Sequence, residues 1–159
     1  LNNSYLQLEY NQADPYFQAS SNTLTSYGHY AQPLGHPSGG NFREVVGIMG
    51  YRWKDVWAEV KALYAQTGQD TAGYSFGSNM NRSIPTDIAK GGDVFITRGD
   101  LIERTYLDMR IGWIINRASN LNLLMGVTYR KSWSATTTDR LEFIYFGIRT
   151  NLRNLYYDN

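Results

Sequence analysis

The side chains best suited to acid–base or metal chemistry are the two histidines, His29 and His36, which both lie between Tyr27 and Phe42. Their spacing matches no standard metal site, and no cluster of carboxylates lies in the same stretch. We expect both imidazoles to hydrogen-bond backbone carbonyls inside a folded loop, with metal ligation as the alternative. Ser, His and Asp are all present, but they form no nucleophile elbow and no triad in a known order. The sequence therefore predicts a protein that is not an enzyme and has no cofactor.

The loop that carries the histidines combines chain-breaking residues with large apolar ones. Its prolines and glycines predict that no regular element forms there. A loop of this length is uncommon unless it is functional or packed on its own side chains. We expect an ordered loop folded inward over the sheet, because burying each large apolar side chain contributes about 1.5–3 kcal/mol. The side chains expected to be buried are Tyr27, Tyr30, Leu34 and Phe42.

Length and composition fit one β-rich domain, residues 1–159. The net charge of +1 indicates neither a nucleic-acid partner nor an acidic substrate. The absence of cysteine excludes disulfides and thiolate metal sites. Thirteen Tyr, four Trp and fifteen Gly, with a mean hydropathy of −0.45, are typical of β proteins with many turns, including outer-membrane barrels. No apolar run is long enough for a transmembrane helix.

Alternation of apolar and polar residues predicts about six strands. Their ranges are 5–11, 42–53, 56–64, 103–115, 121–131 and 140–152. A helix over Trp57 to Gln66 is the alternative for the third strand, because Ala, Glu, Lys and Leu favour helices. The mid-strand charges all fall on the face opposite the apolar residues. These charges are Glu59, Lys61, Arg104, Asp108, Arg110, Arg130 and Arg149.

The connections alternate between short turns and the long loops 12–41 and 68–100, with a polar loop from Ser132 to Asp139. This asymmetry is typical of transmembrane β-barrels, which have short periplasmic turns and long extracellular loops. A soluble β-sandwich or lipocalin-like binder would show the same alternation with its charges in water. Six strands are fewer than the about eight that a membrane barrel needs. We therefore predict an all-β antiparallel sector of a larger transmembrane barrel.

Three blocks resemble a known family: Leu6 to Tyr10, the His29 to Pro37 core of the loop, and Phe146 to Asp158. The chain is similar to the C-terminal part of the Wzi-like capsule-assembly and RemB-like gliding-motility outer-membrane proteins of Bacteroidetes-type bacteria. The resemblance implies the last third of a barrel of about eighteen strands. It also implies a function in attaching or assembling capsular polysaccharide, or a structural place in a machine for gliding motility, secretion or outer-membrane protein assembly. The implied partners are outer-membrane lipid, surface polysaccharide and other outer-membrane proteins.

Candidate ligand-binding residues are aromatic, histidine and arginine side chains at or near the loops. Aromatic faces beside polar groups commonly hold sugar rings, although an interfacial aromatic girdle or loop packing explains the same residues. Inward arginines could line a path for an acidic polysaccharide. The alternative for them is an internal ion-pair network with Glu59, Asp108 and Glu142. The candidate set is Tyr27, His29, Tyr30, His36, Trp133, Arg104, Arg110 and Arg130, with Tyr74 and Arg149 as further members of the two groups.

Overall fold

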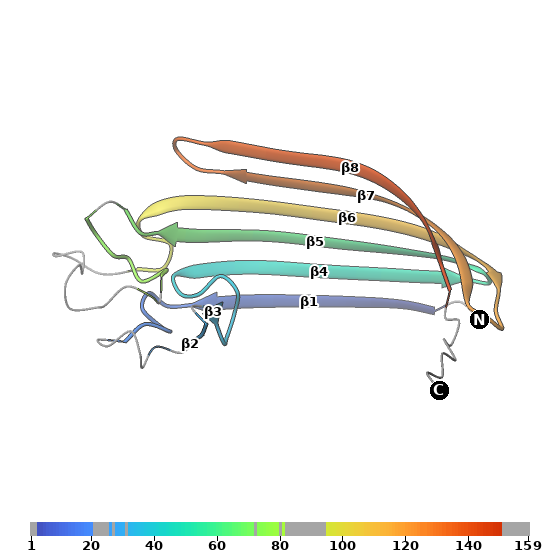
Figure 1. Cartoon of the computed structure of the whole chain (residues 1–159), viewed down its shortest axis with the longest axis horizontal. Helices are drawn as coiled ribbons and strands as arrows, with labels where there is room; N and C mark the ends of the chain where they lie inside the picture. Colours follow the sequence, from blue (N-terminus) through green and yellow to red (C-terminus); the bar gives the residue numbers. More distant parts are fainter. Residues whose placement is uncertain are drawn as a thin grey trace, which may run out of the picture.

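The computed structural model describes residues 3–20, 26, 28–30, 32–71, 73–79, 81 and 95–150. Six long strands form one antiparallel sheet in the order β1-β4-β5-β6-β7-β8, and a two-stranded hairpin, β2-β3, lies apart from it (Figure 1). Every element in the described part of the chain is a strand. The bounds are β1 (Asn3–Ala13), β2 (Gly28–His29), β3 (Gln32–Pro33), β4 (Phe42–Trp53), β5 (Val56–Gln69), β6 (Asp100–Asn116), β7 (Leu121–Trp133) and β8 (Thr138–Arg149). None of the described residues belongs to a helix that could span a membrane.

The predicted antiparallel all-β fold is confirmed. β4 has the predicted range, and β5 and β6 are longer than predicted. The helical alternative for Trp57 to Gln66 is wrong, because these residues pair with β4 on one side and β6 on the other. Cross-strand pairing satisfies backbone groups on both sides of β5, and this outweighs the helix propensity of its Ala, Glu and Lys residues.

The loops differ from the prediction in two places. Residues 28–29 pair with residues 32–33 as β2 and β3, so a regular element does occur in the Pro- and Gly-rich loop. Pro33 ends this two-residue strand, where a missing N–H donor costs little. The connection between β7 and β8 is only residues 134–137, because both strands extend into the predicted polar loop. The Ser134 hydroxyl contacts the Thr137 backbone N–H at 3.3 Å and closes this turn.

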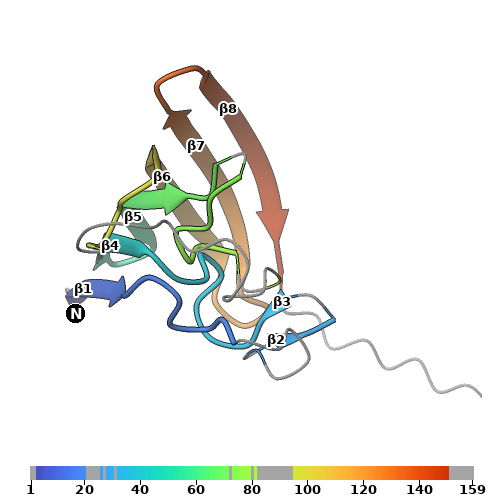
Figure 2. The same cartoon turned by 90° about the vertical axis from the view of Figure 1, so that its left-hand side faces the viewer.

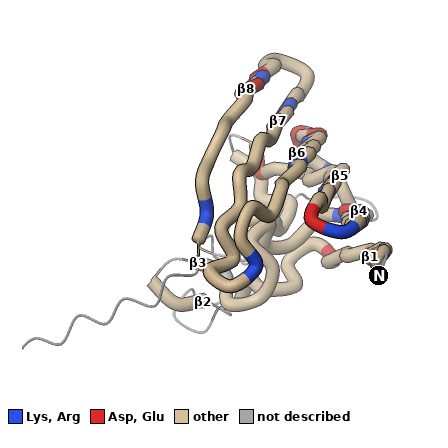
Figure 3. Tube along the Cα trace, turned by 90° about the vertical axis from the view of Figure 1, so that its right-hand side faces the viewer, with Lys and Arg blue, Asp and Glu red and all other residues tan. Residues whose placement is uncertain are grey.

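The sheet is curved into an open trough and does not close into a barrel (Figure 2). β1 and β8 each have one neighbour, so each leaves one edge unpaired. The described parts of the two long connections, 14–41 and 70–99, lie at one end of the strands, which we call the loop end (Figure 1). The turns at 54–55 and 117–120 lie at the other, the turn end. There the two turns are joined by Arg117 Nε and Asp55 Oδ1 at 2.6 Å. Figure 3 views the chain from the turn end, with Lys and Arg positions in blue and Asp and Glu positions in red.

The two faces of the trough have opposite character. The concave face carries all seven of the mid-strand charges predicted to share a face. The convex face is apolar, and its described charged residues all lie toward the loop end: Arg43, Glu103, Lys131, Arg140 and Glu142. Its large exposed apolar side chains are Leu6, Leu8, Tyr10, Val45, Met49, Tyr51, Trp53, Val56, Tyr64, Met109, Ile111, Trp113, Leu123, Met125, Ile144, Phe146 and Ile148. Exposed apolar surface of this extent marks an interaction surface.

Three aromatic rings on the concave face lie flat over a glycine of the next strand. The pairs are Tyr5 over Gly50, Trp57 over Gly112 and Tyr145 over Gly126. A Cβ atom at Gly112 would lie 2.3 Å from the Trp57 ring. The glycines therefore let the aromatic rings lie against the sheet and keep the trough open.

We predict that Gly112→Ala displaces the Trp57 ring and breaks its 3.2 Å hydrogen bond to Asn122 Oδ1. The expected loss of unfolding free energy is about 1–3 kcal/mol, because overpacking forces side chains out of preferred rotamers. Denaturant unfolding followed by tryptophan fluorescence measures it. Gly47→Ala is the matched control, since the nearest atom to its new Cβ is a Leu8 methyl at 3.4 Å. Equal stability of the two variants would contradict the prediction.

Candidate functional site

Asn41 is the junction at the loop end. Its side chain is fully buried, and its Nδ2 donates to the carbonyls of Gly68 and Arg98, both at 2.7 Å. Its Oδ1 accepts from the Thr97 backbone N–H at 2.7 Å. Its own backbone N–H donates to the Asp14 carbonyl at 3.2 Å. One residue thus ties the end of β1 and the end of β5 to the segment that leads into β6. Its φ of 57° lies in the left-handed region, which Asn tolerates better than most residues.

Two loops meet backbone to backbone beside this junction. A Cβ atom on Gly39 would lie 2.6 Å from the Ser78 carbonyl oxygen, and one on Gly40 would lie 2.6 Å from that of Gly77. Only glycine allows this approach. The Tyr16 hydroxyl adds a hydrogen bond of 2.5 Å to the Ser75 carbonyl. The segment around His36 is therefore held against the segment around Ser78.

His36 is held by side-chain contacts rather than by the predicted backbone carbonyls. Its Nδ1 accepts from the Ser38 backbone N–H at 3.2 Å, so in the neutral ring the proton lies on Nε2. Nε2 donates to Glu44 Oε1 at 2.8 Å, and the ring stacks on Phe42 with centroids 4.4 Å apart. The prediction for His36 was wrong because Glu44, on the following strand, brings a buried carboxylate within reach. Among the described residues, no group of three metal-ligand side chains occurs.

A hollow of about 590 Å³ lies on the concave face next to His36, and we call it the inner hollow. Its charged lining divides into two sides. Carboxylates come from β1 and β4, namely Glu9 and Glu44, and cations come from β5, β6 and β7, namely Lys61, Arg104 and Arg130. Tyr106 lies between Arg104 and Asp108 along β6 and is paired with both Leu63 and Arg130, so it forms the floor.

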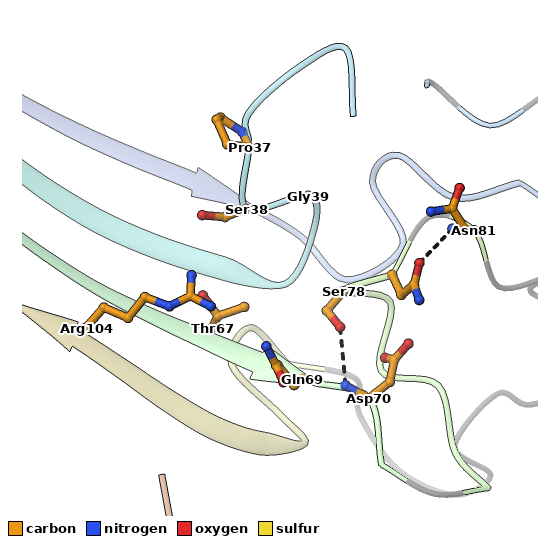
Figure 4. Close-up of a pocket in the computed structure, with 10 residues that line it drawn as sticks. Pro37, Ser38, Gly39, Thr67, Gln69, Asp70, Ser78, Asn81 and Arg104 are labelled. Carbon is orange, nitrogen blue, oxygen red and sulfur yellow. Dashed lines mark hydrogen bonds between the residues drawn. The ribbon is translucent and has the colours of Figure 1, made fainter. Parts of the chain in front are cut away.

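A second hollow of about 410 Å³, the outer hollow, opens at the loop end (Figure 4). Its lining is polar, with hydroxyl and amide groups from Thr67, Gln69, Ser78 and Asn81. Arg104, Pro37 and Ser38 line both hollows. In Figure 4 the Arg104 side chain extends from β6 toward Thr67 on β5. The two hollows therefore adjoin at Arg104.

The structure brings together three of the candidate ligand-binding residues and separates the others. His36, Arg104 and Arg130 line the inner hollow. Arg110 lies further along the concave face toward the turn end, and Arg149 lies opposite Asn122 near the turn end of β8. The four arginines therefore do not form one continuous path.

Arg110 belongs to an internal ion-pair network, which was the predicted alternative to a path for an acidic polysaccharide. Its Nη2 donates to Glu59 Oε1 at 2.8 Å. Its Nε lies 2.8 Å from Asp108 Oδ1, in an ion pair that lacks hydrogen-bond geometry. Thr128 donates to the other Asp108 oxygen at 2.7 Å. Glu142 was wrongly expected in this network: register places it on the convex face, where it pairs with Arg140.

The aromatic candidates that the structure describes line neither hollow. Trp133 lies on the convex face at the loop end, 6.5 Å from the Tyr64 ring, with Lys131 Nζ 5.0 Å from its centroid. His29 and Tyr30 contact each other edge to face at 4.3 Å on the β2-β3 hairpin. Tyr74 pairs with Thr71 in the loop that follows β5. Tyr27 lies outside the described residues.

The predicted burial of the loop is correct for one side chain and wrong for two. Phe42 is 1% exposed, but Tyr30 is 90% exposed and Leu34 is 58% exposed. Phe42 is the first residue of β4, where the His36 ring covers it. Tyr30 lies at the tip of the hairpin, where the described residues offer no apolar surface to cover it.

The candidate set lacked several polar side chains of the inner hollow, among them Tyr106, Lys61 and Glu9. Tyr106 shares a face with Arg104 because the two are two positions apart in one strand, and Lys61 was recognised only as a charge of the polar face. The alternation of faces along β6 could have identified Tyr106 from the sequence. The hollow itself could not be identified in this way, because it depends on the pairing of β5, β6 and β7. Comparison with known protein families, curated proteins and solved structures gave no match.

Proposed function

We propose that the chain is a sector of a transmembrane β-barrel in the bacterial outer membrane and attaches or assembles surface polysaccharide without catalysing a reaction. The observation that carries the proposal is the convex apolar face, whose described charges all lie toward the loop end. Strands of membrane barrels alternate apolar outward and polar inward. On β4 the apolar face runs from Val45 to Trp53, close to the about 9–11 residues of a tilted membrane strand.

The slant of the apolar surface supports the same proposal. On β1 it runs from Leu6 to Tyr10, and on β8 from Ile144 to Ile148. Cross-strand pairing places Leu6 of β1 and Ile144 of β8 in the same row of residues. From this row the apolar surface extends toward the loop end on β1 and toward the turn end on β8. The apolar surface is therefore displaced along the strands by four residues (10 − 6), which is about 13 Å. This displacement accumulates across five strand spacings, about 24 Å in total. The slope of about 30° is near the tilt of about 35–45° found for barrel strands.

The unpaired edges of the sheet also favour a larger barrel. β1 and β8 are long and carry some of the most exposed apolar side chains, including Leu8 and Phe146. Long edge strands with exposed apolar side chains pair readily with other strands, and closure of a barrel removes such edges. In this proposal further strands pair with β1 and β8.

Tryptophan quenching in lipid vesicles tests the membrane placement. We predict that, in single-Trp variants of the full-length protein, a quencher on phospholipid tails quenches Trp113 strongly and Trp57 weakly. Aqueous acrylamide should show the opposite preference. The reason is that Trp113 lies on the convex face and Trp57 on the concave face, on adjacent strands. Quenching of both by acrylamide alone, together with solubility in the absence of detergent, would contradict the placement.

The polysaccharide function is tested on cells. Cells that lack the protein should lose surface polysaccharide, and the intact gene should restore it. The exposed Tyr30 and Leu34 favour a second candidate, a structural barrel subunit of a multi-protein outer-membrane machine, because exposed apolar residues serve protein contacts. Unchanged surface polysaccharide, together with stable co-purification of partner proteins, would favour that candidate.

A further inference from the structure

The inner hollow contains three cations for which the described residues supply no partner side chain. Lys61, Arg104 and Arg130 form no ion pair or hydrogen bond with any side chain in the described ranges. Arg110, on the same face, has both Glu59 and Asp108. Arg104 lies opposite Ser132, and Arg130 lies opposite Tyr106, so the two arginines are diagonal neighbours. Such neighbours are about 7–8 Å apart, which allows two guanidinium groups to converge on one anion.

The carboxylates of the hollow already have hydrogen-bond partners outside the three cations. Glu44 is buried and receives hydrogen bonds from Asn11 at 3.0 Å and from His36 at 2.8 Å. Glu9 accepts from Gln7 on its own strand. Because these two carboxylates lie on the β1–β4 side, they leave the three cations uncompensated on the β5–β7 side. The hollow is therefore bipolar, with acceptors on one side and charged donors on the other.

We propose that the inner hollow binds a carboxylate-bearing sugar, a hexuronate residue of a surface glycan; this rests on the proposed polysaccharide function. Arg104 and Arg130 hold the sugar carboxylate by charge-assisted hydrogen bonds. Tyr106 offers a ring face for the sugar ring to stack on. Glu9 accepts hydrogen bonds from sugar hydroxyls on the opposite side. A bare phosphate or sulfate ion would satisfy the cations but would leave Tyr106 and Glu9 unused.

The neighbouring hollows give room for more than one sugar. The outer hollow shares Arg104 with the inner one. A further hollow of about 370 Å³, lined by Phe143 and Tyr145, shares Tyr106 and Arg130 with it. The three hollows form a row from the loop end toward β8. A row of this kind suits a chain of sugars better than a single small anion.

Binding of defined probes to the detergent-solubilised full-length protein tests the proposal. A galacturonate tetrasaccharide should bind, and its fully methyl-esterified form, which keeps the rings and removes the charges, should bind at least about tenfold more weakly. Inorganic phosphate should not compete at equal concentration. The double variant Arg104→Gln, Arg130→Gln should lose at least about tenfold in affinity for the acid. Arg149→Gln, on the same face near the turn end, should bind as the unmodified protein does.

The outcomes distinguish a failure of the hexuronate proposal from a failure of the proposed polysaccharide function. Equal binding of the acid and the ester would overturn the recognition of a sugar acid and leave the polysaccharide function standing. Competition by phosphate as strong as that by the acid would reveal a general anion site and would also overturn it. Absence of binding by either glycan would overturn it too, and the cell-surface assay would then decide the polysaccharide function independently. Heat-modifiable gel mobility confirms that each variant is folded, so a loss of affinity is not a loss of fold.

Discussion

Ile111→Arg is expected to destabilise the full-length protein in lipid vesicles by about 2–4 kcal/mol, the cost of an arginine near the midplane of the lipid face of a barrel. Ile111 lies on the convex face between Met109 and Trp113, about half exposed. In the proposed orientation its side chain is surrounded by lipid tails. The guanidinium would have no partner there, and the apolar neighbours could not replace its hydration.

The same substitution on the other face provides the control. Ile48 lies on the concave face, paired with Gln7 and Lys61. Ile48→Arg places a charge beside polar groups and water, so only the repulsion from Lys61 opposes it, up to about 1 kcal/mol. Equilibrium unfolding from vesicles, followed by tryptophan fluorescence, measures both variants. A larger loss for Ile48→Arg than for Ile111→Arg would mean that the concave face is the buried one, and it would refute the membrane orientation.

The strands and their faces could be predicted from sequence because alternation is a local signal. The strands are long enough for a period of two to be recognised, although β5 also fitted a helix, and the convex face admits few polar residues along β4, β5 and β6. The bulge near Ile115 escaped prediction, since only the register shift between β6 and β7 reveals it. The length of β5 was underestimated because Gln66, Thr67 and Gln69 look like loop residues when taken alone.

The loops and the hollows could not be predicted because their contacts join residues far apart in the sequence. Burial of Phe42 and exposure of Tyr30 depend on which surface each side chain meets, and not on its own hydrophobicity. His36 was expected to find carbonyls because nothing local identifies Glu44 as its partner across the turn into β4. Arg104 and Arg110 have the same residue type and lie on the same face. Only the pairing with β5 and β7 shows that Arg110 lies beside two carboxylates, whereas no described carboxylate pairs with Arg104.

Asn41 is the residue on which the loop end depends most, and it was passed over in the sequence because Gly-Gly-Asn resembles an ordinary turn. Asn41→Leu keeps the branching of the side chain at Cγ and removes every side-chain hydrogen bond. The Thr97 N–H and the Gly68 and Arg98 carbonyls would then lack their Asn41 partner. Each buried unpaired polar group costs about 1–3 kcal/mol. A branched side chain at a φ of 57° adds backbone strain.

We therefore expect Asn41→Leu to destabilise the loop end by at least about 3 kcal/mol, measured as faster hydrogen exchange of the Gly68 and Thr97 amides. Asn41→Gly separates the two causes, because glycine accepts the positive φ but cannot form the side-chain bonds. If hydrogen bonding dominates, Asn41→Gly should lose most of the stability that Asn41→Leu loses. Asn79→Leu, in an exposed position of the neighbouring loop, should change exchange little. Because Gly68 lies between Thr67 and Gln69, which line the outer hollow, Asn41→Leu should also weaken binding of the galacturonate tetrasaccharide. Unchanged exchange at Gly68 and Thr97 would show that Asn41 fills space and does not tie the loop end together.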